Sequence, residues 1–419
     1  MHHTARRYSK TYGPDWVNSI EINKFCIITS DTMAQLDNPL SWKSPLSWKS
    51  TALTFDAIHS LEPAWSELAA SAEEKNIFAF PWFVSASLPL FQKNCPEIIS
   101  IFEGKLLIGL FLVHHDFGYA KLPIPFYRSS RHLHQFLATP LVRQGCAEQF
   151  AQGVCEWLDN SRSDKSFLLL THLTGDSAVV RALVSVCQSQ KRKLVEIDRF
   201  SRAALNIESS KEPAIERQLS PSRRKSLKRK MKNLKTQGEV VTERLSREED
   251  LESWLANFLE LENAGWKGEV GTSILADQVE IEFYKKMTRA ALQAGALNFF
   301  RLSVSGKPIA YTLDLECKPY AYCMKCAFHP DYKKYSPGIL MEHETLKYYT
   351  EHSDIRFVDS CADPKNQMLN ELWPNHKPIV SYALARKSML HTAVFMMSHK
   401  LKLILKSRNN GSINHQARP

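Results

Sequence analysis

The sequence has no apolar run long enough to cross a membrane. No uncharged apolar window reaches the ~18 residues that a spanning helix needs. Four ionisable side chains interrupt the best candidate, Met389–Leu405: His391, His399, Lys400 and Lys402. The N-terminus is polar and basic, and the apolar stretch of a secretory signal does not follow it. We therefore expect a cytoplasmic protein, peripheral at most at the inner face of a membrane.

Acidic residues are absent from two segments. Arg217–Lys235 holds nine basic residues, and the chain after Glu371 holds eight Lys and Arg, but neither contains an Asp or Glu. The net charge of +10 therefore comes from these two segments. These two basic segments are compatible with an alternative function, in which the protein is non-catalytic and binds nucleic acid or an anionic membrane. The first segment has no interleaved aromatic residues, so nucleic acid is the less favoured partner, and the basic tail is the better candidate for an anionic surface.

The cysteines do not form a disulfide framework. They are nine in number, an odd count, and are spread through apolar segments, which indicates reduced thiols in a reducing compartment. Cys323 and Cys326 make a single C-x-x-C, but a strand places positions i and i+3 on opposite faces. With no second pair of this kind, we expect no metal site.

The length of 419 residues predicts two or three domains with cores of their own. Residues 1–50 have little periodicity and are expected to form an N-terminal extension. Residues 51–210 and 211–385 are expected to be two α/β halves, and residues 386–419 a basic C-terminal helix and tail. Within the extension, PLSWKS occurs at 39–44 and again at 45–50, which predicts an insertion in a loop.

Two hairpins suggest that the halves are related. Ile98–Phe102 and Leu106–Val113 flank a turn with Gly104 and Lys105, and Phe300–Val304 and Ile309–Leu315 flank a turn with Gly306 and Lys307. Chance is the alternative, because such turns are common. The order of helices, hairpin, strand and helix also recurs around each hairpin, which favours two copies of one α/β unit.

The sequence pattern of the second half predicts, in order, a helix, a strand, two helices, three strands, a helix and a strand. Pro221 begins the basic helix, and Ser246 with Glu249 predicts a capping box for the helix after it. A three-strand meander is expected over 297–304, 309–316 and 320–328, followed by a helix from Pro337 and a strand over Ile355–Ser360. This order predicts an α/β layer with one mixed sheet.

The most informative stretch is Ser336-Pro337-Gly338, where a strand and loop lead into a helix. Ser is a good N-cap, Pro suits the first helical position, and Gly lets a ligand approach the backbone. A helix N-terminus binds phosphate oxygens through free N–H groups and its positive dipole end. Lys333 and Lys334 would add charge. The alternative is a plain, well-capped helix start.

These residues resemble the C-terminal half of the GNAT superfamily of N-acetyltransferases. More narrowly, they are similar to the CelD/BcsL-like branch, which is related to Fem-type transferases. The resemblance covers roughly Ser220–Ala385 and rests on motifs spread over it: Ser222–Lys232, Phe258–Gly268, Gly271-Thr272, Gly306–Ala310, Lys325, Ser336-Pro337-Gly338, Asp359–Ala362 and Leu372-Trp373-Pro374.

The resemblance implies two tandem GNAT-like halves, each with a mixed, mostly antiparallel sheet flanked by helices. The second half would be catalytic and the first a degenerate copy. It also implies acetyl-CoA or another acyl-CoA as co-substrate and no metal, with pantetheine between the strands at 320–328 and 355–360. The pyrophosphate loop would be formed by five residues: Ser336, Pro337, Gly338, Ile339 and Leu340. This loop has one glycine where the more familiar family form has two, which leaves room for a longer acyl chain.

The same resemblance implies direct attack of an amine on a thioester. Asp359 is the candidate base or amine-orienting group, or else a carboxylate that caps a turn. Tyr335 is the candidate acid for the thiolate, or else a structural aromatic residue. Lys325 would hold a substrate carboxylate or phosphate, or else lie at a sheet edge. Trp266 and Lys267 would face the acceptor or pack in the core.

The acceptor is expected to be a small-molecule or glycan-linked amine, in polysaccharide or cell-envelope biosynthesis, because the branch carries that association. A related family offers an alternative: a Fem-type transferase that uses aminoacyl-tRNA. In that case the basic helix would bind RNA.

Overall fold

The computed structural model describes residues 45–91, 96–161, 163–207, 219–351 and 353–415. Most of the predicted N-terminal extension lies outside these ranges, and Ser44–Pro419 forms one compact unit. The second copy of the repeat belongs to strand β1 (Leu46–Ala52), so the prediction of a loop insertion is wrong there. Leu46 and Trp48 pack against the core while Ser47 and Lys49 alternate with them, which is the pattern of a half-buried strand.

The described strands form a single mixed sheet of 13 strands. Its order is β1-β2-β3-β4-β6-β13-β7-β12-β11-β10-β9-β8, with β5 paired to β3. The remaining strands have these bounds: β2 (Glu97–Glu103), β3 (Leu106–Tyr119), β4 (Leu122–Ser129), β5 (Leu141–Val142), β6 (Phe167–Thr174), β7 (Leu194–Asn206), β8 (Val240–Arg244), β9 (Leu297–Val304), β10 (Lys307–Cys317), β11 (Tyr320–Phe328), β12 (Phe357–Asp359) and β13 (Asn375–Ala385).

The sheet repeats one pattern twice, running inward from each edge. Among the described strands, β4 pairs parallel with β6 and β11 pairs parallel with β12, and the other neighbours are antiparallel. The hairpins β2–β3 and β9–β10 take equivalent places in the two patterns. This confirms the predicted fold class of two tandem GNAT-like halves, each with a mostly antiparallel sheet.

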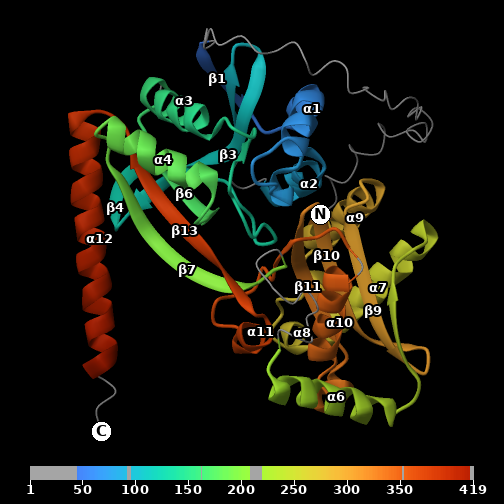
Figure 1. Ribbon diagram of the computed structural model, residues 1–419. Coiled ribbons are helices and arrows are strands. Elements are labelled where there is room, and N and C mark those ends of the chain that lie inside the picture. The colour runs from blue at the N-terminus through green and yellow to red at the C-terminus, as the bar shows by residue number, and fades with distance from the viewer. Residues whose placement is uncertain (1–44, 92–95, 162, 208–218, 352, 416–419) are drawn as a thin grey trace, which may run out of the picture. The chain divides into compact units, whose positions relative to one another are not determined.

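The two halves exchange their last strands. β7 ends the first half in sequence but pairs with β12 of the second, and β13 ends the second half but pairs with β6 of the first. β7 and β13 also pair with each other over most of their length. Figure 1 shows them as two long arrows that run side by side from one half to the other. Each half therefore depends on a strand that the other supplies.

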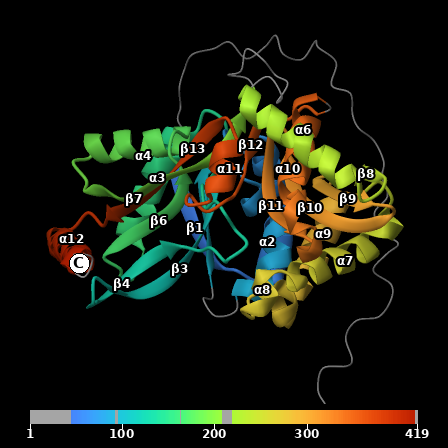
Figure 2. The same ribbon diagram turned by 90° about the horizontal axis from the view of Figure 1, so that it is seen from below.

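Helices cover both faces of the sheet, as the two views show (Figures 1 and 2). In the second half, α7, α8 and α9 lie on one face and α6 and α10 on the other, each over its own apolar cluster. The described helices are α1 (Phe55–Ala70), α2 (Pro81–Ser87), α3 (Ala147–Asn160), α4 (Ala178–Ser189), α6 (Pro221–Lys235), α7 (Leu251–Ala264), α8 (Trp266–Glu269), α9 (Gln278–Gln293), α10 (Pro337–Glu351), α11 (Gln367–Leu372) and α12 (Met389–His415).

The start of α7 differs from the prediction. The expected capping box of Ser246 and Glu249 is wrong, because Glu248–Asp250 form a short 3-10 helix and α7 begins only at Leu251. The guanidinium of Arg247 donates to both carboxylate oxygens of Asp250 at 2.8 Å, and this contact stabilises the 3-10 turn.

Candidate active site

A groove opens where β11 and β12 diverge. The two strands pair over only three residues each, Tyr320–Tyr322 with Phe357–Asp359, and then separate. Between them lies a cavity of about 750 Å³. Its walls come from β10, β11, the start of α10 and the segment after β12. They include Thr312, Cys323, Met324, Lys325, Cys326, Phe328, Ser336, Gly338, Ile339, Glu342, Ser360 and Cys361.

A β-bulge interrupts β11 at the groove. Lys325 lies opposite Leu313 and Cys323 opposite Asp314, so Met324 is an extra residue with no partner of its own. Bulges of this kind re-aim side chains and interrupt the ladder of main-chain hydrogen bonds. The bulge places both Met324 and Lys325 in the wall of the groove.

The predicted phosphate loop forms one end of the groove. Ser336, Gly338 and Ile339 line it, while Pro337 and Leu340 are buried beside it. The prediction that Ser336 caps the helix through its side chain is wrong. Its backbone is left-handed (φ 57°), and its hydroxyl accepts a hydrogen bond from Lys230 Nζ at 2.6 Å. α6 thus delivers a cation to the N-terminus of α10, a contact that the sequence did not predict.

Gly338 lies at a closely packed position next to Phe328 and Cys326 of β11. A Cβ at this position would lie 3.2 Å from the ring of Phe328 and 3.8 Å from the Sγ of Cys326. A larger side chain would have to displace that ring or enter the groove. Glycine therefore lets the first turn of α10 pack closely against Phe328, and its role in binding a ligand stays a prediction.

Lys325 and Lys267 share a buried carboxylate on one wall. Lys267 Nζ lies 2.9 Å and Lys325 Nζ 3.9 Å from Oε1 of Glu262, whose residue is only 4% exposed. The other oxygen of Glu262 accepts from the main-chain N–H of Ile274 at 2.9 Å. Burial and the charge of Lys267 lower the pKa of Lys325 to about 8, although Glu262 opposes them. A fraction of Lys325 is therefore a neutral amine near physiological pH.

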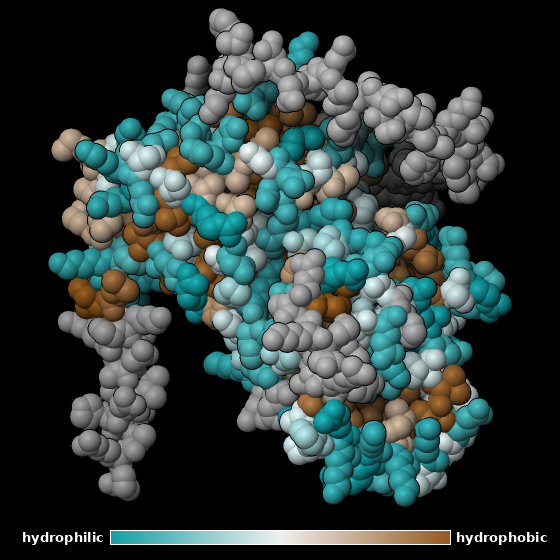
Figure 3. Space-filling model, in the orientation of Figure 1, coloured by the Kyte–Doolittle hydropathy of each residue, from teal (hydrophilic) through white to brown (hydrophobic). Residues whose placement is uncertain are grey.

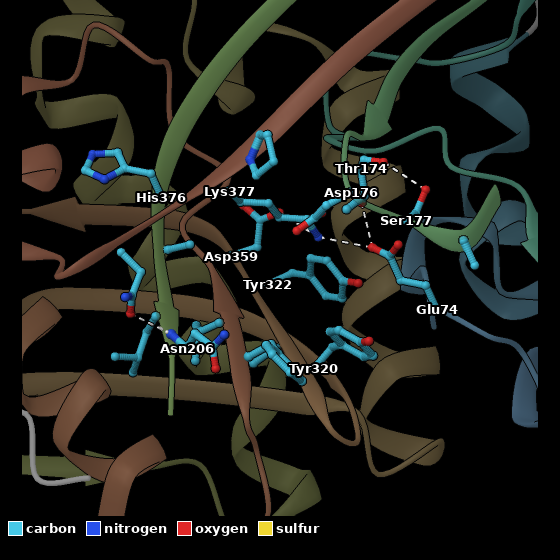
Figure 4. Close-up of a pocket in the computed structure, with 18 of the residues that line it drawn as sticks. Glu74, Thr174, Asp176, Ser177, Asn206, Tyr320, Tyr322, Asp359, His376 and Lys377 are labelled. Carbon is cyan, nitrogen blue, oxygen red and sulfur yellow. Dashed lines mark hydrogen bonds and ion pairs between the residues drawn. The ribbon is translucent and has the colours of Figure 1, made fainter. Parts of the chain in front are cut away.

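Asp359 borders a second, polar cavity of about 450 Å³ rather than the groove (Figure 4). Its carboxylate accepts from Arg202 at 2.6 Å and from the main-chain N–H of Cys361 at 2.9 Å, and it lies 3.6 Å from Lys377. Burial alone would raise the pKa of Asp359, but Arg202 and Lys377 lower it below its ordinary value. A carboxylate with a low pKa is a weak base. The role of Asp359 as a base stays a prediction, and this geometry counts against it.

The second cavity joins the two halves of the chain. Lys377 of β13 lies 3.3 Å from Glu74, which accepts a hydrogen bond from Thr174 at 2.6 Å. Figure 4 shows these side chains converging from opposite sides, with Asp359 beside them. The charges of Arg202, Asp359, Lys377 and Glu74 alternate in sign, so each buried charge has an opposite neighbour.

Tyr335 and Trp266 are the two remaining candidate residues. Tyr335 is half-buried against the core under α10, with Lys334 Nζ 4.9 Å from its ring centroid, and it is not among the residues that line the groove. Its role as an acid stays a prediction. Trp266 begins α8, but its side chain lies outside the described part of the structure.

Glu342 is a groove residue that the sequence did not reveal. It lies one turn after Gly338 on α10, is 5% exposed and lines the cavity beside Thr312. Burial raises its pKa to about 7, so its carboxyl changes charge near neutral pH. A glutamate on a helix is usually a surface residue, and only the tertiary structure shows that this one faces the groove.

The first half differs at the place that corresponds to the groove. The segment after β4 fills the space between β4 and β6, where Ala138 donates to His172 and Thr174 donates to the hydroxyl of Thr139. A cavity of about 20 Å³, room for about one water molecule, lies between this segment and β3. The same segment sends Phe136 into the wall of the second half's groove, where its carbonyl accepts from Arg202 at 3.2 Å.

The described residues form neither a metal site nor a membrane-spanning helix. They contain no group of three His, Cys, Asp or Glu placed to hold a metal ion. Within the same residues, no helix combines the length and the apolar character that crossing a membrane requires. The seven cysteines that the structure describes are free thiols.

Comparison with known proteins identifies a domain in the second half. The model of the acetyltransferase (GNAT) domain matches residues 221–366, the part of the chain that contains the groove. No curated protein matches the sequence. The crystal structure of FemX is similar with a TM-score of 0.52 and 10% identity, covering 83% of this chain and 99% of that one.

A conserved protein of unknown function from Bacteroides thetaiotaomicron is similar to the same degree. Its TM-score is 0.51 at 9% identity, and the match covers 81% of this chain and 100% of that one. At such identities these structures show the fold alone, and the narrower CelD/BcsL-like assignment stays a prediction. Residues 221–366 therefore form an acyltransferase-type domain that matches the acetyltransferase (GNAT) family.

Proposed function

We propose that the protein is an acyl-CoA-dependent N-acyltransferase whose donor lies in the groove between β11 and β12. The observation that carries the proposal is the divergence of these strands, with the N-terminus of α10 at one end of the opening and Lys325 on its wall. An extended thioester arm fits an opening between two strands. Its anionic end fits a helix N-terminus with a cation beside it.

The donor's pyrophosphate would be held by α10 and two lysines. The first turn of α10 supplies main-chain N–H groups, Lys230 reaches Ser336 from α6, and Lys333 lines the groove. The arm would then follow β11 past Gly338, whose lack of a Cβ leaves the backbone accessible. This placement sets the thioester near the bulge at Met324.

The reaction forms a C–N bond and breaks the C–S bond of the thioester. A main-chain N–H at the bulge stabilises the oxyanion that develops on the carbonyl oxygen. Neutral Lys325 accepts the proton that the attacking amine loses, because its low pKa leaves it partly unprotonated. The departing thiolate takes up one proton, so the products are an amide and a free thiol with no net change in protons.

Ligand binding tests the proposal directly. The full chain is titrated with coenzyme A, acetyl-CoA and long-chain acyl-CoA, and thermal unfolding is followed. A donor at about 100 times its dissociation constant raises the free energy of unfolding by about 2.7 kcal/mol. Gly338→Asp, which puts a carboxylate against the pyrophosphate, should remove the shift while the unliganded protein still unfolds cooperatively. If none of these compounds stabilises the wild-type protein, the donor assignment is wrong.

A second candidate is a Fem-type transferase that uses aminoacyl-tRNA. It is favoured by a groove of about 810 Å³ between α6 and α10. Five cations line this groove: Arg224, Lys225, Lys228, Lys232 and Lys235. Salt-sensitive binding of tRNA, together with no stabilisation by any CoA compound, would replace the first candidate by this one.

A further inference from the structure

One side of α12 packs against the sheet of the first half. Phe395 and Ser398 are fully buried, and the ring of Phe395 lies 5.0 Å from that of Phe167 on β6. Beyond them, the hydroxyl of Tyr119 lies 3.3 Å from Nδ1 of His399. These contacts fix which side of α12 faces the protein.

The other side of α12 carries a stripe of exposed apolar side chains. Its members form two adjacent rows at seven-residue spacing, so they lie along one face. They are Met389 (93% exposed), Met396 (39%) and Leu403 (54%), and Leu390 (70%), Met397 (65%) and Ile404 (42%). Figure 3 shows tan and brown side chains along this helix at the left edge, above its grey end. No described segment of the chain covers this stripe.

The pattern does not suit pairing with a second copy of the helix. A two-stranded coiled coil needs apolar residues both at the positions of Met389, Met396 and Leu403 and three residues after each. Those following positions hold Thr392, His399 and Lys406. Two copies would also bring like charges together, because no acid follows Glu371.

The charges around the stripe suit an anionic surface. Lys400 is exposed and lies within the same face, and Lys387 is exposed just before α12 begins. The end of β3 and the turn that follows it add exposed Phe117 and Lys121, two residues to either side of Tyr119. Apolar side chains with interspersed lysines are what a helix needs to lie in the interface of an anionic bilayer.

We propose that the exposed stripe of α12 docks the protein on the surface of an anionic lipid bilayer. The helix lies in the plane of the interface, with the apolar stripe among the acyl chains and Lys400 at the level of the headgroups. The side with Phe395 stays on the protein. This surface is separate from the groove and does not depend on the donor that the groove binds.

Vesicle sedimentation of the full chain tests the proposal. The vesicles are pure phosphatidylcholine, or phosphatidylcholine with about 30% phosphatidylglycerol. We expect the wild-type protein to bind the anionic vesicles at least about tenfold more tightly. The double variant Met397→Glu/Leu403→Glu should lose that binding. The matched control Leu133→Glu/Val270→Glu, which changes two apolar residues that are 72% and 61% exposed elsewhere, should keep it.

Three outcomes would overturn the proposal: no binding of the wild-type protein to anionic vesicles, equal binding to both kinds of vesicle, or loss of binding in the control as well. Sedimentation velocity without lipid gives a further check. A wild-type dimer that dissociates in the α12 variant would show that a second copy covers the stripe. Thermal unfolding of each variant should match the wild type, because all four substituted side chains are exposed.

Discussion

At the scale of single residues, two lysines in or next to β11 have different surroundings. Lys325 is largely buried beside Glu262 and Lys267, whereas Lys318, at the turn between β10 and β11, has 61% of its side chain exposed. The two lysines are only seven positions apart on the chain. Burial, and not residue type, makes one of them a candidate for proton transfer.

We predict that Lys325→Met lowers kcat by about 10²- to 10⁴-fold and leaves the KM for the acyl donor nearly unchanged. Because the neutral amine is the active form, the wild-type rate should rise with pH through a pKa of about 8. The variant should lose that rise. The measurement is thiol release from acetyl-CoA with a panel of primary amines across pH.

Lys318→Met serves as the matched control, since it removes an exposed lysine near the same strand. It should keep both the rate and the pH profile. A Lys325→Met enzyme with an unchanged pH profile would show that another group accepts the proton.

At the scale of elements, α6 presents two flanks with different contacts. Lys230 donates to Ser336 at the start of α10, whereas Lys228 lies in the separate groove between α6 and α10. Both residues are lysines of the same helix. A comparison of their variants therefore tests the position of the charge and not its chemical type.

Lys230→Ala should weaken binding of coenzyme A by about tenfold, because a hydrogen bond between charged groups contributes about 1.5–3 kcal/mol. Lys228→Ala should change the dissociation constant by less than about twofold. Isothermal titration calorimetry gives both values. Equal losses in the two variants would mean that α6 acts only through its overall charge.

Local patterns predicted most of the elements of the second half. Three kinds of signal were sufficient for this: the turn glycines of the hairpins, Pro221 and Pro337 at helix starts, and the alternation of side chains in β9 to β11. They did not show that Ser336 binds Lys230 or that Glu342 faces the groove. Those two facts depend on how α6 and α10 pack on the sheet, and periodicity within one element does not contain that information.

At the scale of the whole molecule, buried charges link the halves. Arg202 of β7 and Asp359 of β12 form a pair at 2.6 Å in which the side chains are 3% and 4% exposed. The family resemblance implies that Asp359 is a base or an amine-orienting group, with a carboxylate that caps a turn as the alternative. Its partner lies 157 residues away on a strand of the other half, which no local pattern indicates.

Asp359→Asn should lower the free energy of unfolding by about 3–5 kcal/mol, because it leaves Arg202 buried without its charge partner. Asp354→Asn breaks the exposed pair with Lys318 and should lower the free energy of unfolding much less, because water screens that pair. Urea unfolding measures both.

The Asp359 contribution also depends on pH. Since the folded pKa of this carboxyl lies below the unfolded one, the contribution is present above the unfolded value of about 3.9 and is lost as pH falls through the folded value. A destabilisation by Asp359→Asn no larger than that by Asp354→Asn would mean that the pair contributes little.

The exchange of β7 and β13 has a consequence for how the chain is made. When a ribosome has added the first 210 residues, β7 has been synthesised but its neighbours β12 and β13 have not. β6 likewise lacks β13, so the nascent first half has an open sheet edge next to apolar surface until Ala385 emerges. Neither half can be completed alone, and the protein reaches its stable state only after β13 has been translated.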